Sequence, residues 1–531
     1  MNKYKNNNDF RVLFLYPNIQ MSALAPQGIG YLSAVLKSND YIVDLFDCTF
    51  YSSDDTSDTN QEKINNLNVR PFNWSEKGIT MKSTNMVEDF KIKIDDFMPD
   101  LIAVSVVENT WLLASHLLDT IKNEILVIVG GVFSTYAPEI VINHPKVNYL
   151  CRGDGEKPLL TLVNKLSEND LESTKNIPNI WAKIDGNMYK NQIGLGFDMD
   201  ELPFPDWSIF EEQSLYRPMQ GRVYKTMGVE TQRGCPYTCT FCNSPANNIV
   251  YKAETGSTFH RKKSVSRVRE ELEFMVKNYK PEFIYFVVDT FLAMGDRELE
   301  EFSEMYQDFN IPFWMNTRAE TVNEWRADQL EKMNCLRMNI GIEHGNYEYR
   351  KQVLKRDISN EKMLKSFNAC SGRSFVCVAN SIIGMPDENR DLIFDTIKFN
   401  KSLPDDIEAT GAFIFTPYHG TELRDYAIRK GYLEDGTVCT LNVTKGSILD
   451  MPELSKEAIL NLAKVFSFYV KFEEERWIEI EKVETNFSNS QKGLEKLQDE
   501  YRDRFYIKPS KSLKNAKDLV ISAADYSDLH G

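Results

Sequence analysis

Short apolar runs alternate with amphipathic stretches along the first third of the chain. Uninterrupted apolar runs of this length indicate buried strands, and apolar residues that recur every three or four positions indicate helices packed on a sheet. These patterns predict strands at 11–18, 41–48, 100–107, 125–131 and 147–156 and helices at 26–40, 111–122 and 157–169. Strands that alternate with helices in this way predict an α/β fold with a doubly wound parallel sheet of the flavodoxin-like kind.

The same alternation returns after residue 263. A helical pattern that begins at a serine covers 264–279, and further helices are predicted around 295–309, 321–333, 355–370 and 391–403. The strands between them are predicted at 283–288, 313–316, 336–343, 375–386 and 408–423, the last two with turns. Parallel pairing follows from this order, so the chemistry is expected at the carboxyl ends of the strands.

Three less regular segments divide the chain. Residues 51–95 are acidic and polar, which predicts a long loop or insertion between the second and third strands. Residues 185–222, with "ELPFPDW", are interpreted as a linker. An apolar stripe over 455–485 predicts a helix that caps the second unit. The expected parts are therefore a first domain at 1–184, the linker, a second domain at 223–450 and a helical region at 451–531.

The composition is that of a soluble globular protein. Its 531 residues are 42% hydrophobic and 26% charged. The longest apolar run, at 125–133, is too short to span a bilayer, and the polar N-terminus does not resemble a signal peptide, so a cytoplasmic location without a membrane partner is expected. The net charge of −16 argues against nucleic acid as a partner and favours a small molecule or a peptide as the substrate.

Glycines follow strands of the first sheet without forming a nucleotide-binding motif. No GxGxxG follows the first strand and no GxxxxGK[ST] occurs, so dinucleotide and P-loop sites are not expected. Doubly wound sheets bind ligands outside the carboxyl ends of their strands, where glycines let the backbone approach a ligand closely. The candidate ligand-binding residues at these ends are Ser105, Glu108, Asn109, Gly130, Gly131 and Gly153.

Three of the nine cysteines, Cys235, Cys239 and Cys242, lie in "TQRGCPYTCTFCNSP". A structural zinc site usually needs four ligands in two separated pairs, and a redox CxxC needs only two thiols. Three thiolates on one tight loop suit three irons of a [4Fe–4S] cube whose fourth iron is left for a ligand that is not protein. The other six, at 48, 151, 335, 370, 377 and 439, are scattered and are interpreted as buried small hydrophobic residues.

The cysteine stretch resembles the RGCPYxCxFC motif of radical S-adenosylmethionine (SAM) enzymes. The resemblance implies a partial (β/α)6 barrel, a [4Fe–4S] cluster and SAM chelated at the open iron through its amino and carboxylate groups. One electron, from a donor such as flavodoxin or ferredoxin, then breaks a carbon–sulfur bond and yields a 5′-deoxyadenosyl radical. The protein holds and orients the reactants and excludes water and oxygen.

Motifs at the strand ends extend the resemblance. "GIEHG", "IIGMP" and "TPYHGTEL" resemble the family's GIESG, IxGxP and PYPGTxL. By this resemblance Asp289 approaches the methionine amino group of SAM, while Arg318 and Glu343 meet its methionine end or its ribose. Phe241, between the last two thiols, is included among the candidate SAM-binding residues as apolar cover. His344 replaces a small residue, and the sequence leaves open whether it is structural or faces the substrate; no catalytic acid or base is assigned.

A second resemblance concerns the first domain. "GGVFSTYAPE" with "CRGDGEKPL" resembles the GGxHxTxxPE…RGEGE pattern of cobalamin-binding domains fused to radical SAM enzymes, and together with the cysteine motif the likeness covers most of 10–450. The candidate residues of the first sheet would then bind cobalamin. No histidine follows the first strand, so cobalamin is expected to bind without a protein histidine below cobalt. Phe133 stands where the pattern has histidine, and a degenerate domain that holds no cobalamin stays an alternative.

These resemblances imply an anaerobic enzyme that transfers a methyl group to an unactivated carbon of a natural product or peptide, with methylcobalamin as the methyl donor. A radical cyclase or rearrangement enzyme without methyl transfer is the second interpretation. A redox sensor or maturation partner that carries a cluster but performs no turnover is the third, from a different class of protein. Detection of S-adenosylhomocysteine and of 5′-deoxyadenosine separates the three.

Overall fold

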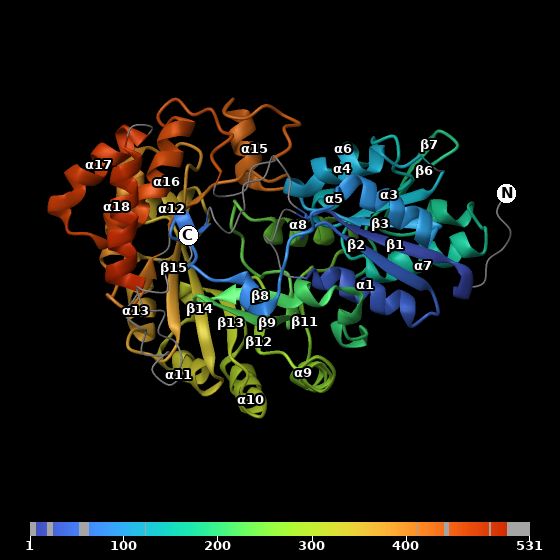
Figure 1. Ribbon diagram of the computed structural model, residues 1–531, viewed down its shortest axis with the longest axis horizontal. Helices are drawn as coiled ribbons and strands as arrows, with labels where there is room; N and C mark the ends of the chain where they lie inside the picture. The colour runs from blue at the N-terminus through green and yellow to red at the C-terminus, as the bar shows by residue number, and fades with distance from the viewer. Residues whose placement is uncertain are drawn as a thin grey trace.

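Two α/β units lie side by side, and a group of helices packs against the second (Figure 1). The computed structural model describes residues 7–18, 25–51, 63–122, 124–409, 411–439, 445–487 and 490–506. Parts of the predicted insertion (52–62) and of the C-terminal region (507–531) therefore lie outside the described residues. No helix in the described ranges is long and apolar enough to cross a membrane.

The first unit is a seven-stranded sheet in the order β2-β1-β3-β4-β5-β6-β7. The first five strands are parallel and have the predicted flavodoxin-like order, which confirms the fold class. Their bounds are β1 Arg11–Tyr16, β2 Ile42–Asp47, β3 Leu101–Ser105, β4 Leu126–Gly130 and β5 Tyr149–Cys151. Alternate residues of β1 belong to different cores, since Val12 and Phe14 face one side and Leu13 and Leu15 the other. A strand buried on both faces explains its uninterrupted apolar sequence.

Helices cover both faces of this sheet. Helices α1 (Gln27–Lys37) and α7 (Glu156–Ser167) pack on one face. The other face is covered by α3 Met86–Phe97, α4 Trp111–Asp119, α5 Val132–Tyr136 and α6 Pro138–Ile142. Helix α3 begins inside the segment interpreted as an insertion, where the Asn85 side chain caps its first turn.

The sequence patterns missed an antiparallel hairpin at the edge of the first sheet. Strand β6 (Ile180–Ile184) pairs with β5 and with β7 (Asn187–Lys190). Asp185 and Gly186 join the two strands, and both have a positive φ, of 48° and 76°. An Asp-Gly pair between short strands is a strong hairpin signal, so the turn was detectable in the sequence. The first sheet thus continues into residues that were interpreted as linker.

The second unit is an eight-stranded sheet that curls into a half-barrel (Figure 1). Its parallel strands are β9 Arg222–Val229, β12 Phe283–Phe286, β13 Phe313–Arg318, β14 Cys335–Glu343, β15 Val376–Ile383 and β16 Glu408–Ala409, with β17 Phe413–Ile414 also paired to β15. Strand β8 (Tyr216–Met219) adds an antiparallel edge. This arrangement confirms the predicted partial (β/α)6 barrel.

Helices surround the outside of the half-barrel and extend it at the C-terminal end. Those that follow the strands are α9 Val265–Tyr279, α10 Asp296–Gln307, α11 Glu324–Lys332, α12 Tyr347–Gln352, α13 Asn360–Cys370, α14 Arg390–Lys401 and α15 Glu422–Arg429. Helices α16 (Lys456–Lys471), α17 (Trp477–Thr485) and α18 (Gln491–Tyr501) share a second core with the last strands. The C-terminal region is therefore helical, as predicted, over the described residues.

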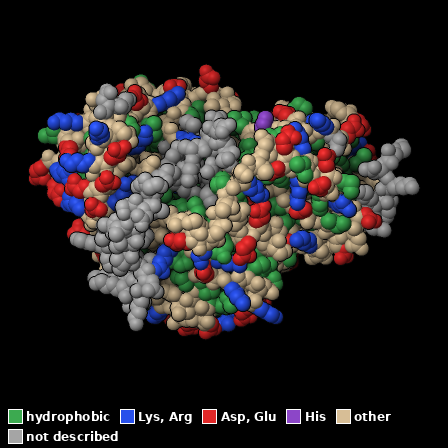
Figure 2. Space-filling view, viewed as in Figure 1, with side chains coloured by type: hydrophobic (Ala, Val, Ile, Leu, Met, Phe, Trp, Pro, Cys, Tyr) green, Lys and Arg blue, Asp and Glu red, His purple; other side chains and the backbone are tan. Residues whose placement is uncertain are grey.

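On the face shown in Figure 2, acidic and basic side chains are intermingled over both units. The described residues there form no continuous basic stripe of the kind that follows a nucleic-acid backbone.

Candidate active site

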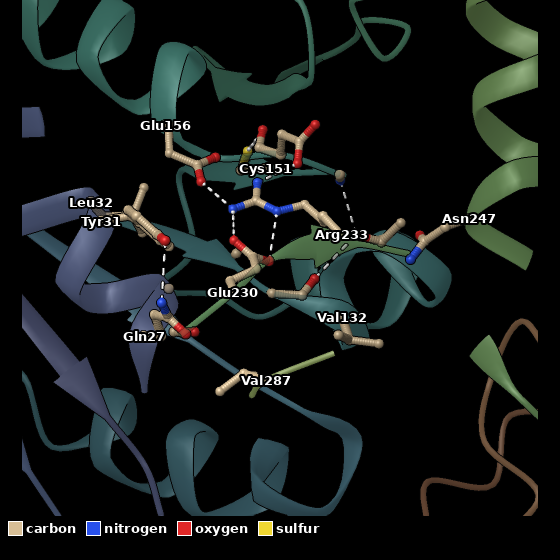
Figure 3. A pocket seen from close by; sticks show the side chains of 18 of the residues that line it. Gln27, Tyr31, Leu32, Val132, Cys151, Glu156, Glu230, Arg233, Asn247 and Val287 are labelled. Carbon is tan, nitrogen blue, oxygen red and sulfur yellow. Dashed lines mark hydrogen bonds and ion pairs between the residues drawn. The ribbon is translucent and has the colours of Figure 1, made fainter. Parts of the chain in front are cut away.

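The carboxyl ends of the two sheets face a common cavity of about 660 Å³ (Figure 3). From the first unit it is lined by Gln27, Tyr31, Ser105, Gly130, Gly131, Cys151, Gly153 and Glu156, among others. From the second it is lined by Glu230, Gln232, Arg233, Gly234, Ser244, Tyr285, Val287, Asp289 and Asn316, among others. Its size is that of a small-molecule or cofactor site.

Four of the six candidates in the first sheet lie on this cavity: Ser105, Gly130, Gly131 and Gly153. Gly131 has a φ of 102°, and a Cβ there would lie 2.4 Å from the carbonyl oxygen of Val106. Gly153 has a φ of 71°, and a Cβ there would lie 2.5 Å from the hydroxyl of Tyr251. A side chain at either position would force the loop out of place, so both loops need glycine to form the cavity wall.

The other two candidates, Glu108 and Asn109, lie outside the cavity lining and join the first unit to the last loop of the half-barrel. The Glu108 carboxylate accepts hydrogen bonds of 2.8 Å from the backbone amides of His419 and Cys439 and lies 2.8 Å from His419 Nδ1. Burial alone would raise the pKa of Glu108, but these hydrogen bonds lower it. The Tyr418 hydroxyl donates to Asn109 Oδ1 at 2.9 Å. The geometry gives this pair a role in holding the two units together.

The three predicted cluster cysteines lie on one loop between β10 (Gln232–Arg233) and α8 (Asn243–Thr255). Cys242 is the N-cap residue directly before α8, at the positive end of the helix dipole. Arg318 donates from Nη1 to Cys239 Sγ at 2.8 Å, and Cys235 Sγ lies 3.5 Å from the Thr290 hydroxyl. Burial raises the pKa of all three thiols, that of Cys242 to about 12, so each stays protonated until a metal displaces its proton.

The donor set fits an iron–sulfur cube better than a single metal ion. Within the described ranges, no three His, Cys, Asp or Glu side chains are grouped so that they could hold one ion. In a cube each thiolate binds a different iron, so the three sulfurs surround a cluster rather than one point. Positive charge from Arg318 beside Cys239 would stabilise the thiolate form. The remaining six cysteines are buried, as predicted.

The predicted SAM-binding residues differ in their placement. Asp289 lines the cavity and accepts a short hydrogen bond from the Ser244 hydroxyl; desolvation by the surrounding walls raises its pKa. Arg318 forms an ion pair with Glu320 and stacks 3.9 Å above the ring centroid of Tyr237, next to the cysteine loop. The side chains of Asp289 and Arg318 therefore lie where they could contact a ligand bound at the cluster.

Glu343 and Phe241 lie further from the cavity and are not part of its lining. Glu343 Oε1 is 2.6 Å from Arg356 Nη1, and its backbone has a φ of 64°. Burial raises the pKa of Glu343, although Arg356 acts in the opposite direction. Phe241 packs against the core shared by the last strands and the C-terminal helices. The SAM-binding roles of all four residues, Asp289 and Arg318 included, stay predictions.

His344, which the sequence left open, is fully buried away from the cavity. Its Nδ1 accepts a hydrogen bond from the backbone amide of Asn346 at 3.0 Å, and its Nε2 lies 3.2 Å from Glu388 Oε1. The imidazole stacks on Tyr349 with ring centroids 4.3 Å apart. Both His344 and Glu388 are 0% exposed, so His344 is structural.

Sequence reasoning missed an arginine at the centre of the cavity wall. Arg233 lies between three carboxylates from two units, with contacts of 2.7 Å to Asp154, 2.9 Å to Glu156 and 2.9 Å to Glu230 (Figure 3). Asp154 also pairs with Arg261 at 2.7 Å. Asp154 and Glu156 belong to "RGDGE" and Arg233 to "TQRG", so the two motifs that carried the resemblances contact each other directly.

Comparison with known proteins identifies a radical SAM domain in this chain. Residues 229–399 match the radical SAM superfamily. An uncharacterized methyltransferase of Pyrococcus horikoshii is 28% identical over 395 residues, which are 71% of this chain and 80% of that protein. The anaerobic magnesium-protoporphyrin IX monomethyl ester cyclase of Rubrivivax gelatinosus is 22% identical over 431 residues, 78% of this chain and 69% of that protein.

Among solved structures, the cobalamin-dependent S-adenosylmethionine radical enzyme OxsB, with aqua-cobalamin and S-adenosylmethionine bound, superposes with a TM-score of 0.63 at 16% identity. The superposition covers 93% of this chain and 71% of that one, so the likeness in fold extends over both sheets. The matched superfamily range contains all three cluster cysteines. Residues 229–399 therefore form a radical SAM domain, which implies a [4Fe–4S] cluster and SAM as cofactors, and the chain as a whole shares the fold of OxsB.

Proposed function

We propose that this enzyme is a cobalamin-dependent C-methyltransferase that acts on a natural product or peptide. The observation that carries the proposal is the single cavity into which the ends of both sheets open. Gly130, Gly131 and Gly153 lie on one side of it, and Gly234 and Asp289 lie on the side of the cysteine loop. A corrinoid held by the first sheet and SAM held at the second would therefore share one space.

When bound, the cluster and SAM supply a 5′-deoxyadenosyl radical that removes a hydrogen from the substrate, and cobalamin supplies the methyl group. The residues of the chain bind and orient these groups. Cys235, Cys239 and Cys242 hold the cluster, and Arg318 favours the thiolate of Cys239. Asp289 would accept hydrogen bonds from the methionine ammonium of SAM, and the hydrogen bond from Ser244, which orients its carboxylate, supports this role.

The inner face of the half-barrel gives the proposed substrate a polar surface. Asn316 Nδ2 donates to the Tyr285 hydroxyl at 3.2 Å, and Asn339 Nδ2 donates to Asn316 Oδ1 at 3.3 Å. Tyr285 and Asn316 line the cavity. This row of hydrogen-bonding groups favours a substrate with polar functions near the reacting carbon.

The second candidate function is a radical cyclisation, because a cyclase is among the relatives that span most of this chain. The two functions share the radical step and differ in the methyl transfer. Anaerobic enzyme, reconstituted with iron, sulfide and cobalamin and supplied with a flavodoxin or ferredoxin reductant, is incubated with SAM and candidate substrates. Methyl transfer requires that 5′-deoxyadenosine and S-adenosylhomocysteine form together. 5′-Deoxyadenosine without S-adenosylhomocysteine supports the cyclase, and the absence of both in the presence of substrate supports the redox sensor.

Replacing Asp289 with alanine is expected to weaken SAM binding by about ten- to a hundredfold, because a charge-assisted hydrogen bond contributes about 1.5–3 kcal/mol. Equilibrium dialysis of labelled SAM against the iron-reconstituted protein measures the change. Asp328→Ala is the matched control, since Asp328 is a half-exposed residue of α11 that pairs with Arg373 and does not line the cavity. An unchanged dissociation constant in Asp289→Ala would remove this residue from the SAM site.

A further inference from the structure

Gln27 and Tyr31 lie one helical turn apart on α1 and both line the cavity (Figure 3). The Gln27 side-chain nitrogen donates to the Tyr31 hydroxyl at 3.2 Å. Gln27 is 8% exposed and Tyr31 is 1% exposed, so both polar groups are withdrawn from bulk water. The helical spacing of four residues brings the amide and the phenol together on the face that points into the cavity.

The Tyr31 oxygen accepts a second hydrogen bond, of 2.7 Å, from Lys263 Nζ. Lys263 forms a close ion pair with Glu271, and both side chains are 1% exposed. The phenol oxygen thus receives two donors, while its own O–H has no acceptor among the described residues. A hydroxyl has one hydrogen to donate, and with both donors on the protein side that hydrogen is free to point toward a ligand.

The Gln27 carbonyl oxygen, Oε1, is buried and has no hydrogen-bond partner within the described part of the chain. Gly228 lies next to this oxygen. A Cβ at position 228 would lie 3.1 Å from Gln27 Oε1 and 2.9 Å from the Val287 side chain. Glycine at this position therefore leaves room for the Gln27 amide, which a larger residue would displace. A buried acceptor without a partner costs about 1–3 kcal/mol, so an orphaned oxygen on a residue that lines a cavity favours a ligand that satisfies it.

We propose that Gln27 and Tyr31 form a donor–acceptor pair that binds an amide-type edge of a ligand in this cavity. The ligand's N–H donates to Gln27 Oε1, and the Tyr31 hydroxyl donates to the ligand's acceptor atom. Lys263 and Glu271 position the phenol from behind and do not contact the ligand. Two ligands of the proposed function offer such an edge: the carboxamide side chains of the corrinoid ring, and the adenine of SAM. The inference rests on the proposed function for the presence of these ligands.

Binding titrations of the full chain, reconstituted with its cluster, test the pair without an activity assay. Hydroxocobalamin binding is followed by its visible absorbance after gel filtration, and S-adenosylhomocysteine binding by calorimetry. Gln27→Leu and Tyr31→Phe are each expected to weaken one of the two ligands by about three- to tenfold, the effect of one hydrogen bond, and to leave the other unchanged. Weakened hydroxocobalamin identifies the carboxamide, and weakened S-adenosylhomocysteine identifies the adenine.

Matched controls separate the pair from general damage. Tyr41→Phe removes a hydroxyl of the same domain that donates to Asn164 outside the cavity lining, and Gln352→Leu removes an amide on the outside of the half-barrel. Both controls should bind like the wild type. Unchanged affinity for both ligands in Gln27→Leu and Tyr31→Phe overturns the inference, whereas wild-type protein that binds no hydroxocobalamin contradicts the proposed function instead.

Wild-type protein alone provides a measurement that does not depend on whether the variants fold. Where the corrinoid is the ligand identified, cobalamin with one carboxamide hydrolysed to a carboxylate loses the N–H donor. At least one such regioisomer should bind about three- to tenfold more weakly than cobalamin. Equal or tighter binding of every monocarboxylate isomer overturns the carboxamide assignment. Where adenine is the ligand identified, the purine nucleoside analogue that lacks the exocyclic amino group is the corresponding probe.

Discussion

Cys239→Ala is expected to lose the iron–sulfur absorbance and the formation of 5′-deoxyadenosine together. Three thiols on the loop between β10 and α8 are the donors available to the cluster, and Cys239 is the one that Arg318 contacts at 2.8 Å. Removing a supporting partner of a metal ligand typically costs about 10- to 100-fold in metal affinity or activity, so loss of the ligand itself should cost more than about 100-fold. Iron and sulfide quantification after anaerobic reconstitution, with absorbance spectra and nucleoside analysis, provides the measurement.

Cys370→Ala is the matched control for this experiment. Cys370 is 2% exposed in the main core, and its thiol donates to the carbonyl oxygen of Ser366 at 3.3 Å. The same change there removes one buried sulfur and should cost only about 1–2 kcal/mol of stability. Iron content and 5′-deoxyadenosine formation should stay at the wild-type level. A Cys239→Ala protein that retains a full cluster and turns over would refute the assignment of the three cysteines.

The two sheets were predictable because their strands are apolar in uninterrupted runs and their helices repeat with a period near 3.6. In β1, the adjacent residues Leu13 and Phe14 face different cores, which is why no polar position interrupts the run. The edge hairpin of β6 and β7 has a different pattern. Residues of β7 are mostly exposed, so hydrophobicity does not reveal it, and only the Asp-Gly turn does.

Local sequence predicted the glycines of the cavity better than its polar residues. Gly131 and Gly153 are fixed by the backbone next to them, since their positive φ values belong to turns that follow strands. Glu108 also follows a strand, but the 3-10 helix at Glu108–Thr110 carries it toward His419. His419 is 311 positions away from Glu108 in the chain, and no repeating pattern of hydrophobic residues indicates a contact over such a separation.

His344 and Gln27 illustrate the same limit. His344 stands within a motif, yet its burial depends on Glu388 and Tyr349, which belong to other elements. Gln27 looks like an ordinary residue at the start of an amphipathic helix, and its amide fits beside the second unit because position 228 there is a glycine. Sites made between two domains combine residues whose spacing in sequence carries no information about their distance in space.

Arg233→Met is expected to destabilise the protein by about 3–5 kcal/mol, the cost of breaking a buried ion pair from one side. Among the described residues, Arg233 is the cation that pairs with Glu156 and Glu230. The side chains of Arg233, Glu156 and Glu230 are 14%, 6% and 16% exposed. Methionine is of similar length and apolar, so the packing is largely kept while the positive charge is lost. Urea denaturation followed by circular dichroism measures the change, and Tyr31 and Gln27 should still line a cavity in the folded variant.

The size of this loss should depend on pH. Burial alone would raise the pKa of Asp154, but Arg233 and Arg261 lower it, so the stabilisation that this carboxylate contributes is present above its unfolded-state pKa of about 3.9 and is lost as the pH falls through the folded-state value. The stability difference between wild type and variant should therefore be largest above about pH 5 and shrink as the pH falls below about 4. Arg269→Met, which removes exposed ion pairs to Glu273 and Asp308, should leave the stability nearly unchanged at any pH. An equally small loss for Arg233→Met would mean that the contact between the two motifs contributes little to holding the cavity together.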